Sequence, residues 1–168
     1  MGHQRRPDSD RCFMIREATM ADMPQLLRLA AAAHDGAGLS KPDARNGFWF
    51  PFDAEITARQ IASHIRPPTS LVALYVVDDR PEGCIIAAAT NYPNAPLRLA
   101  AELVFWIEPA HRGRGGPMLL EYFERWAATQ RCQFAHISSK RDPRFAKWLD
   151  RRGYAPVETQ HLKPLKAG

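Results

Sequence analysis

The chain has 168 residues, of which 45% are hydrophobic and 24% charged, and its formal net charge is +5. This size and composition are typical of one soluble globular domain that buries a core of its own. No apolar run approaches the ~20 residues of a membrane span, so a membrane protein is not expected. The cysteines Cys12, Cys84 and Cys132 are too scattered for a metal cluster or a disulfide framework, which favours a reducing cytoplasm.

The first third of the chain predicts a strand and two helices. Residues 1–12 are polar and are expected to be a disordered lead, with the domain proper over 13–168. A strand is expected over 13–16, a helix over 20–34 with Thr19 as its N-cap, and a second helix that Asp53 caps and that ends near His64. The long loop between these helices, 35–52, is rich in Gly and Pro and ends in an aromatic cluster. Such loops are often functional or mobile.

The remainder alternates strands and helices. A turn over 78–82 between two apolar runs indicates a hairpin, Pro117 suits the first position of a helix, and Gly153 suits a helix end. The expected elements are strands over 70–77, 83–90 and 98–107, a helix over 117–129, a strand over 133–138, a helix over 143–152 and a closing strand over 154–165. This order predicts one mixed-sheet α/β domain.

The segment 112–116, RGRGG, lies between a predicted strand and a predicted helix. Its glycines leave backbone N–H groups accessible at the positive end of a helix, which is an arrangement suited to a phosphate or pyrophosphate. The surrounding stretch 111–152 holds ten Arg and Lys against four acids. A solvated basic face is one explanation and nucleic-acid binding another, but a basic rim around a phosphate-bearing ligand accounts better for its location.

This order of elements, with its Arg/Gly segment after the fourth strand, resembles the GNAT superfamily of acyl-CoA-dependent N-acetyltransferases. The superfamily pattern Arg/Gln-x-x-Gly-x-Gly/Ala fits from Arg112 to Gly115, whereas Pro117 stands where the last small residue is expected. The piece 145–158, FAKWLDRRGYAPVE, is similar to the superfamily's closing helix and Gly-aromatic step. The stretch 102–116 and the YAPVE ending also resemble a branch common in phages and prophages. The resemblance implies a single-domain mixed, mostly antiparallel sheet with a splayed central strand and flanking helices.

The resemblance also implies a binding site for acetyl-CoA. Its pyrophosphate would lie on the backbone of the Arg/Gly segment, where Pro117 would remove one N–H donor. Its pantetheine arm would add like a strand to Trp106 and Ile107. The implied cofactor-binding residues are Trp106, Ile107, Arg112, Gly113, Arg114, Gly115, Gly116 and Pro117. For the three glycines, the alternative is a tight strand-to-helix turn without a ligand.

Glu102 is the candidate general base for removing a proton from an acceptor amine. Strand alternation predicts Glu102, Val104 and Trp106 on one face, with Leu103, Phe105 and Ile107 on the other. Burial in such an apolar strand would raise the pKa of the carboxyl. The alternatives are a Glu at the solvated mouth of the splay, or one paired with an Arg for structure.

The superfamily's usual general acid is a Tyr, and Leu149 occupies that position here. Tyr122, Tyr154 or water would then protonate the leaving thiolate, or the thiolate leaves unprotonated, or turnover is slow or absent. The histidines His34, His64, His111, His136 and His161 show no metal-ligand spacing. We expect them to be structural or exposed, and we expect no bound metal.

The acceptor pocket is expected to involve Phe48, Trp49 and Phe50, which form either a wall over the substrate or a plug on the core. The expected function is direct transfer of acetyl from acetyl-CoA to a primary amine of a small molecule or a protein. The alternative is a catalytically silent acyl-CoA-binding module. Neither nucleic acid nor membrane is expected as a partner, and a homodimer is possible.

Overall fold

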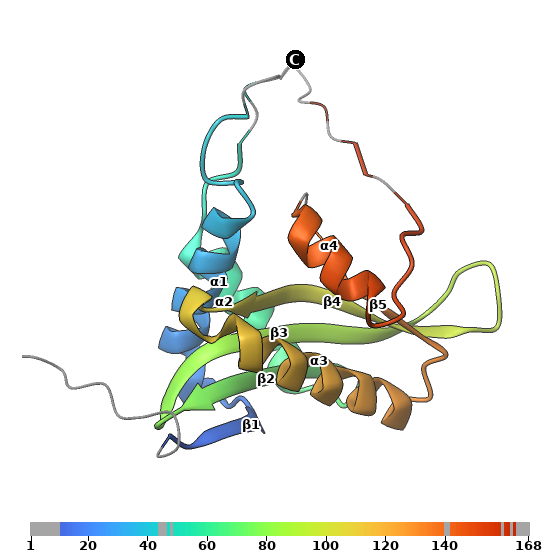
Figure 1. The fold of residues 1–168 in the computed structure, drawn as a ribbon, viewed down its shortest axis with the longest axis horizontal. Helices are drawn as coiled ribbons and strands as arrows, with labels where there is room; N and C mark the ends of the chain where they lie inside the picture. Colours follow the sequence, from blue (N-terminus) through green and yellow to red (C-terminus); the bar gives the residue numbers. More distant parts are fainter. Residues whose placement is uncertain are drawn as a thin grey trace, which may run out of the picture.

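The strands follow one another across a single sheet in chain order, β1-β2-β3-β4-β5 (Figure 1). The first four are antiparallel to their neighbours, and β5 runs parallel to β4. The computed structural model describes residues 11–43, 47, 49–139, 142–158, 160, 161 and 163. The elements are β1 (Phe13–Glu17), α1 (Met23–Gly36), α2 (Ala54–Ile65), β2 (Ser70–Val77), β3 (Arg80–Asn91), β4 (Arg98–Ile107), α3 (Arg112–Thr129), β5 (Phe134–His136) and α4 (Pro143–Asp150), with 3-10 turns at Met20–Asp22 and Pro109–His111. The predicted single-domain α/β fold is confirmed.

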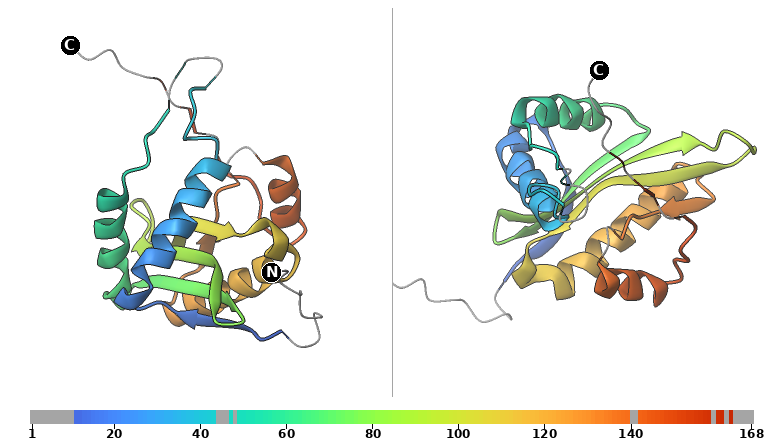
Figure 2. Two further views of the ribbon diagram at one scale, coloured as in Figure 1. Left: turned by 90° about the vertical axis from the view of Figure 1, so that its left-hand side faces the viewer. Right: turned by 90° about the horizontal axis from the view of Figure 1, so that it is seen from above.

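The helices form two layers around the sheet. Helices α1 and α2 cover one face, and α3 and α4 cover the other (Figure 2). Each face has its own buried cluster, because successive strand residues point to opposite sides. The face under α3 buries Tyr75, Ile85 and Phe123, and the face under α1 and α2 buries Leu26, Leu74 and other apolar residues.

The hairpin between β2 and β3 turns on only two residues. Asp78 and Asp79 have φ of 48° and 65°, and Val77 pairs directly with Arg80. Positive φ at both central residues matches the twist of the flanking strands, and Asp tolerates it better than most residues. The turn is therefore shorter than the five residues, 78–82, that the sequence predicts.

Aspartate side chains cap the N-termini of α2 and α4. The Asp53 carboxylate accepts a hydrogen bond from the Ile56 N–H (2.8 Å), which confirms the predicted N-cap of α2. The Asp142 carboxylate accepts from the Arg144 N–H (2.9 Å) in the same way at α4. Beyond α4, Gly153 has φ of 86°, as expected of a residue that ends a helix.

Two predicted elements are wrong. Helix α3 begins at Arg112 and not at Pro117, so the Arg/Gly segment is its first turn and Pro117 lies inside it. The expected closing strand over 154–165 is also missing: the described residues of that stretch form no strand, Pro156 lacks an N–H, and Val157 is 82% exposed. Strand β5 is also shorter than the predicted 133–138.

Candidate functional site

The strands β4 and β5 separate partway along β4. Their parallel pairing covers only Leu99 to Ala101 on β4, and β5 ends at His136 opposite Ala101. Strand β4 continues to Ile107, so its edge from Glu102 onward faces no strand of the described chain on that side. This is the splay expected of the central strand, and it leaves backbone groups of β4 open to pairing with an extended ligand.

A β-bulge in β4 lies where this gap begins. Ile86 pairs with Val104 and Ala87 pairs with Glu102, which leaves Leu103 as an extra residue on β4. A bulge sets two neighbouring side chains on the same face and so interrupts the alternation. Leu103 and Val104 therefore share the face under α1 and α2, while Glu102 lies on the face under α3. The predicted grouping of Glu102 with Val104 is wrong, because the bulge carries no mark in the sequence.

Glu102 sits at the apex of the gap between the two strands. It is 6% exposed, and its Oε2 accepts a hydrogen bond from the Ser138 N–H (3.1 Å). Ser138 follows β5 at the point where the chain has left β4, so the carboxylate spans the two diverging segments. The described geometry thus places a buried carboxylate where the acyl group is expected, and the solvated-mouth alternative does not hold.

The N-terminus of α3 follows this free stretch of β4, after Glu108 and the 3-10 turn Pro109–His111. The first N–H groups of a helix have no partner within it, and the helix dipole makes this end positive. Adding a Cβ at Gly113 would meet no atom within 4 Å, so an anion can approach the backbone there. Residues 112–114 are therefore the best placed to hold a pyrophosphate.

The other two glycines of this turn face protein rather than solvent. A Cβ on Gly115 would lie 2.8 Å from the Tyr75 ring, so this glycine allows α3 to pack closely on the sheet. A Cβ on Gly116 would lie 3.7 Å from Trp148 of α4, an ordinary contact. Close packing of α3 on the sheet is therefore sufficient to explain why residue 115 is a glycine, without any ligand.

Pro117 has a different effect from the one expected. Within α3, an N–H at position 117 would bond to the Gly113 carbonyl, four residues earlier. Its absence removes a bond inside the helix rather than a donor to the ligand. The expectation of a missing pyrophosphate donor at Pro117 is therefore wrong.

The two arginines of the segment stack on aromatic rings at different places. The Arg112 guanidinium lies 5.0 Å from the centre of the Trp106 ring, and its Nε donates to the Ile107 carbonyl (3.2 Å). The Arg114 guanidinium lies 4.1 Å from the centre of the Phe13 ring. Both add positive charge around the start of α3, but neither is a free arm.

Trp106 is held firmly at the end of β4. A Cβ on Gly36 would come within 2.4 Å of its ring, so the end of α1 packs directly against it. Its indole Nε1 is buried and has no hydrogen-bond partner among the described residues. No local sequence pattern predicts this contact with Gly36, because it joins residues far apart in the chain.

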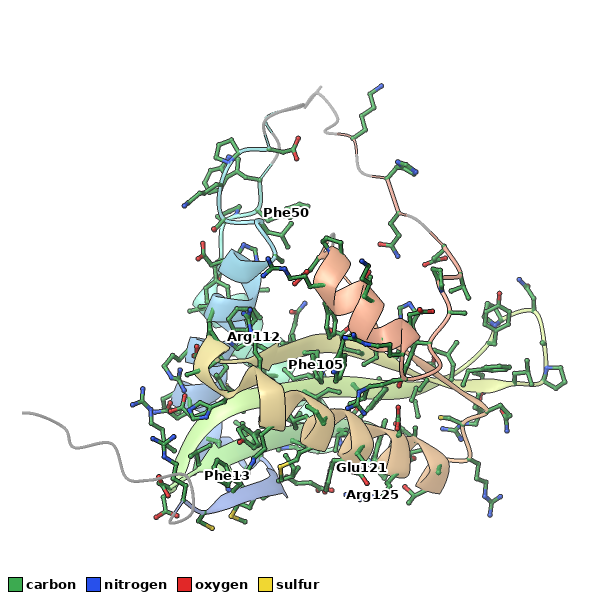
Figure 3. All side chains as sticks on the ribbon, in the orientation of Figure 1. Phe13, Phe50, Phe105, Arg112, Glu121 and Arg125 are labelled. Carbon is green, nitrogen blue, oxygen red and sulfur yellow. The ribbon has the colours of Figure 1, made fainter. Side chains whose placement is uncertain are left out.

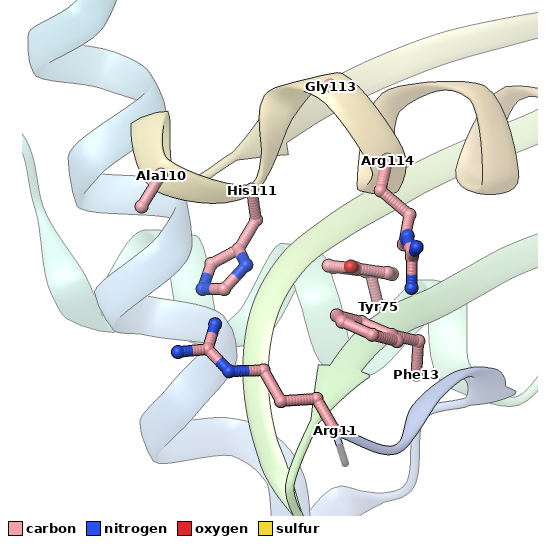
Figure 4. A pocket seen from close by; sticks show the side chains of 7 residues that line it. All are labelled: Arg11, Phe13, Tyr75, Ala110, His111, Gly113 and Arg114. Atoms are coloured by element: carbon pink, nitrogen blue, oxygen red, sulfur yellow. The ribbon is translucent and has the colours of Figure 1, made fainter. Parts of the chain in front are cut away.

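A cationic cavity of about 180 Å³ lies beside the start of α3, on the side toward β1 (Figure 4). Three basic side chains face it, and the Tyr75 and Phe13 rings form its floor. Its lining is Arg11, Phe13, Tyr75, Ala110, His111, Gly113 and Arg114. The cavity extends the positive surroundings of the predicted pyrophosphate position.

Aromatic side chains of α4 stack against β4 beside the gap between β4 and β5. The ring centres of Phe105 and Phe145 are 5.7 Å apart, those of Phe145 and Trp148 are 5.6 Å apart, and Arg152 lies over Trp148. Leu149, at the position of the expected acid, is 5% exposed and part of the core under α3. That position therefore contributes packing rather than a proton.

Neither candidate tyrosine hydroxyl is available as expected. Tyr154 donates to Glu124 (3.0 Å), and burial followed by this carboxylate raises the pKa of Tyr154. Tyr122 contacts Glu17 on β1 (3.4 Å), and burial together with Glu17 raises the pKa of Tyr122. Since β1 is the opposite edge of the sheet from β5, Tyr122 lies away from the gap.

The aromatic loop is only partly described, and Phe48 lies outside the described residues. Trp49 is 51% exposed and Phe50 is 44% exposed, so they do not plug the core. Figure 3 shows Phe50 beyond the end of α1, away from the sheet. The Phe50 carbonyl contacts Nε2 of His34 (2.7 Å), which ties the loop to α1. Among the described aromatic residues of the loop, Phe52 packs on the core, whereas Trp49 and Phe50 do not.

Among the described residues, no group of three or more His, Cys, Asp or Glu could hold a metal ion. In the same part of the chain, no helix is both long and apolar enough to cross a membrane.

Comparison with known proteins identifies the family. The model of the acetyltransferase (GNAT) family matches residues 38–154, whereas curated protein sequences showed no significant match. A mutant of the BH1408 protein from Bacillus halodurans superposes with a TM-score of 0.75 at 15% identity, over 91% of this chain and 99% of that one. An aminoglycoside antibiotic 6'-N-acetyltransferase from Acinetobacter baumannii gives 0.69 at 16%, over 94% and 100%. A ribosomal-protein-alanine N-acetyltransferase from Brucella melitensis biovar Abortus 2308 gives 0.66 at 14%, over 92% and 100%.

These structures share the fold, and the matched family model covers both the splayed strand and the Arg/Gly segment. The chain belongs to the acetyltransferase (GNAT) family.

Proposed function

We propose that this protein transfers an acetyl group from acetyl-CoA to a primary amine by direct transfer. The observation that supports this most is the free stretch of β4, Glu102 to Ile107, which leads straight into the N-terminus of α3. An extended arm ending in a pyrophosphate fits that sequence of features, because the strand edge offers backbone pairing and the helix start offers N–H donors.

Each part of the donor has its own contacts in this proposal. The pyrophosphate lies on the amides of Arg112, Gly113 and Arg114, with the cationic cavity beside them. The pantetheine arm pairs with the backbone at Trp106 and Ile107. Since Arg112 already donates to the Ile107 carbonyl, pairing there shares or displaces that bond.

Acetyl-CoA supplies a thioester whose acyl carbon is open to attack by a neutral amine. In the proposed reaction the new C–N bond forms, the C–S bond breaks, and Glu102 takes the proton that the amine nitrogen loses. The thiolate then takes a proton from water, because Leu149 offers none and both tyrosines are held elsewhere.

The test measures thiol release from acetyl-CoA with a panel of amines. The panel includes an aminoglycoside and a peptide that begins with alanine, since two structural neighbours are named for such acceptors. Glu102→Gln keeps the shape and an acceptor for the Ser138 N–H, so it is expected to fold and to bind CoA as before. Its rate should fall by roughly 10²–10⁴-fold. Glu121→Gln, the same change at a 66% exposed side chain, is the matched control.

Two outcomes would contradict the proposal, one concerning Glu102 and one concerning the whole reaction. If its rate of amine acetylation equals that of the parent across pH, Glu102 is not the base. If no amine in the panel releases thiol although CoA binds, the proposed reaction fails as a whole.

A second candidate is a catalytically silent acyl-CoA-binding module. The buried Leu149, together with Tyr122 and Tyr154 held by carboxylates, is the observation that favours it. Binding of acetyl-CoA without thiol release would support it over the enzyme.

The proposal also includes a phage-type branch of the family, a cytoplasmic setting, no nucleic acid or membrane as partner, and a homodimer. Light scattering on the purified protein measures the oligomeric state, and the electrophoretic mobility of labelled DNA measures nucleic-acid binding.

A further inference from the structure

A second cavity, of about 300 Å³, lies on the face of the sheet under α1 and α2. It is walled by both helices and by strands β3 and β4. Its lining is Ala30, Thr57, Gln60, Ile61, His64, Ile86, Leu103 and Val104. This volume lies at the lower end of the range for small-molecule pockets.

The β-bulge places one wall of this pocket directly next to the proposed acyl site in the chain. Leu103 and Val104 both line the pocket because the bulge turns them to the same face. They directly follow Glu102, where β5 leaves β4. One wall of the pocket is therefore the same stretch of strand along which the acyl donor is proposed to lie.

The pocket has an apolar lining with few polar groups. None of its lining residues is Asp, Glu, Lys or Arg, and the polar ones are Thr57, Gln60 and His64. An ammonium ion buried there would lose its hydration without gaining a counter-charge, so burial favours the neutral amine. A neutral amine is the form that attacks a thioester. A polycation, by contrast, would place several charges against apolar walls.

His64 presents a defined hydrogen-bond acceptor. Its Nδ1 lies 2.8 Å from the Gln60 carbonyl and 3.2 Å from the Ser63 hydroxyl. We assign the hydrogen to Nδ1, because the carbonyl can only accept whereas the hydroxyl can donate or accept. The Ser63 hydroxyl also donates to that carbonyl (2.7 Å). In the neutral ring, Nε2 is then an acceptor, and no other described residue bonds to it. The Thr57 hydroxyl donates to the Asp53 carbonyl (2.6 Å), which leaves only its lone pairs for a ligand.

We propose that this pocket binds the acceptor, a small primary monoamine with an apolar body, whose N–H donates to Nε2 of His64. The proposal rests on the acetyltransferase function proposed above and names its substrate class. His64 is a binding residue that orients the amine, and Glu102, the proposed base, lies on the other face of β4, beside the gap. The sequence alone predicted only a structural or exposed role for His64.

The first experiment compares amines by thiol release and by calorimetry in the presence of CoA. The probes are benzylamine and phenethylamine as apolar monoamines, spermidine as a polycation, and a short peptide beginning with alanine. The monoamines are expected to have the highest kcat/KM. Highest kcat/KM for spermidine or the peptide would overturn the proposal while leaving the acetyltransferase function intact.

The second experiment separates the two nitrogens of His64. In His64→Asn, the amide can still donate to the Gln60 carbonyl, but nothing replaces Nε2; in His64→Gln, the longer amide places an oxygen near the Nε2 position. His64→Asn is expected to raise KM for benzylamine about 3- to 10-fold, the loss of one hydrogen bond, with little change in kcat. His64→Gln should recover part of this loss. An unchanged KM in His64→Asn would overturn the proposal.

The third experiment changes the charge of the pocket. Gln60→Glu adds a carboxylate at its exposed rim and is expected to lower kcat/KM for benzylamine while raising it for spermidine. Gln130→Glu makes the same change at the end of α3, away from the pocket, and should alter neither. Equal effects of the two variants would contradict the assignment.

Calorimetry distinguishes failure of the acetyltransferase function from failure of the proposed amine pocket. Benzylamine binding that weakens in His64→Asn, without thiol release from any variant, would refute the acetyltransferase function and retain the amine pocket. Thiol release with other amines, without benzylamine binding, would refute the amine pocket and retain the acetyltransferase function.

Discussion

Alanine substitutions at Gly113 and Gly115 are expected to change stability in opposite directions, although both glycines lie in the first turn of α3. At Gly115 the added methyl would lie 2.8 and 2.9 Å from two Tyr75 ring carbons and 3.2 Å from Ile107. Tyr75 is fully buried and cannot move aside cheaply. Overpacking of this kind costs about 1–3 kcal/mol, and the better helix propensity of Ala offsets about 1 kcal/mol. We expect a net loss of roughly 1 kcal/mol, and up to about 2 kcal/mol.

At Gly113 the same methyl meets no atom within 4 Å, so only the gain in helix propensity remains. Gly113→Ala is expected to raise the free energy of unfolding by a few tenths to about 1 kcal/mol. If the amides of residues 112–114 hold the pyrophosphate, the methyl also obstructs its approach to the backbone, so CoA affinity should fall. Gly116→Ala, with only an ordinary contact to Trp148, should behave like Gly113→Ala in stability.

Thermal and urea unfolding measure the first effect, and CoA titration measures the second. For a domain of this length, 1 kcal/mol corresponds to about 2–4 °C in Tm. The expected order of Tm is Gly113→Ala above the parent and Gly115→Ala below it. Equal Tm values for the two variants would refute the close packing of α3 on Tyr75. Higher stability of Gly113→Ala with unchanged CoA affinity would refute the placement of the pyrophosphate.

Two further predictions concern mainly stability. Pro117→Ala restores an N–H for the Gly113 carbonyl and is expected to raise stability by about 1–3 kcal/mol with little change in CoA affinity; a marked gain in CoA affinity would instead support a ligand-facing donor at this position. Arg16 hydrogen-bonds to Asp22 (2.7 and 2.9 Å) and holds the pKa of Asp22 down, from 3.8 to about 2. Because the folded-state pKa is lower than the unfolded one, this pair stabilises the fold above about pH 4 and loses its effect as the pH falls toward 2. Asp22→Asn should cost about 1–2 kcal/mol at pH 7, allowing for the partial exposure of Arg16, and much less at pH 2. Equal losses in urea unfolding at both pH values would contradict the role of the pair.

The elements that the sequence predicted well are those with local causes. Strands β2 and β4 were predicted with the boundaries observed, because their apolar runs end at strong turn residues. The start of α2 followed from the carboxylate of Asp53, which bonds to a backbone N–H three residues on. Each of these features depends on neighbours in the chain and on nothing distant.

The elements that the sequence missed depend on tertiary contacts. The composition of residues 112–116 indicates a turn, yet they are helical because Gly115 allows the helix to rest on Tyr75 from β2. A closing strand needs a partner edge, and the described residues after Gly153 do not pair with β5. The extra residue Leu103 in β4 is defined only by the register against β3.

That one extra residue has the largest consequence for the proposed site. Without it, Glu102 and Val104 would share a face, and the candidate base would point into the same layer as the amine pocket. With it, Glu102 lies under α3 while Leu103 and Val104 wall the pocket under α1 and α2. Strand β5 leaves β4 directly beside Glu102. In the proposed arrangement the acyl donor enters from the α3 side and the amine from the α2 side, and the gap beside the bulge is where they meet. Deleting Leu103 should therefore restore regular alternation, leave CoA binding in place and abolish amine acetylation; full activity in that deletion, measured by thiol release, would show that the bulge has no part in the reaction.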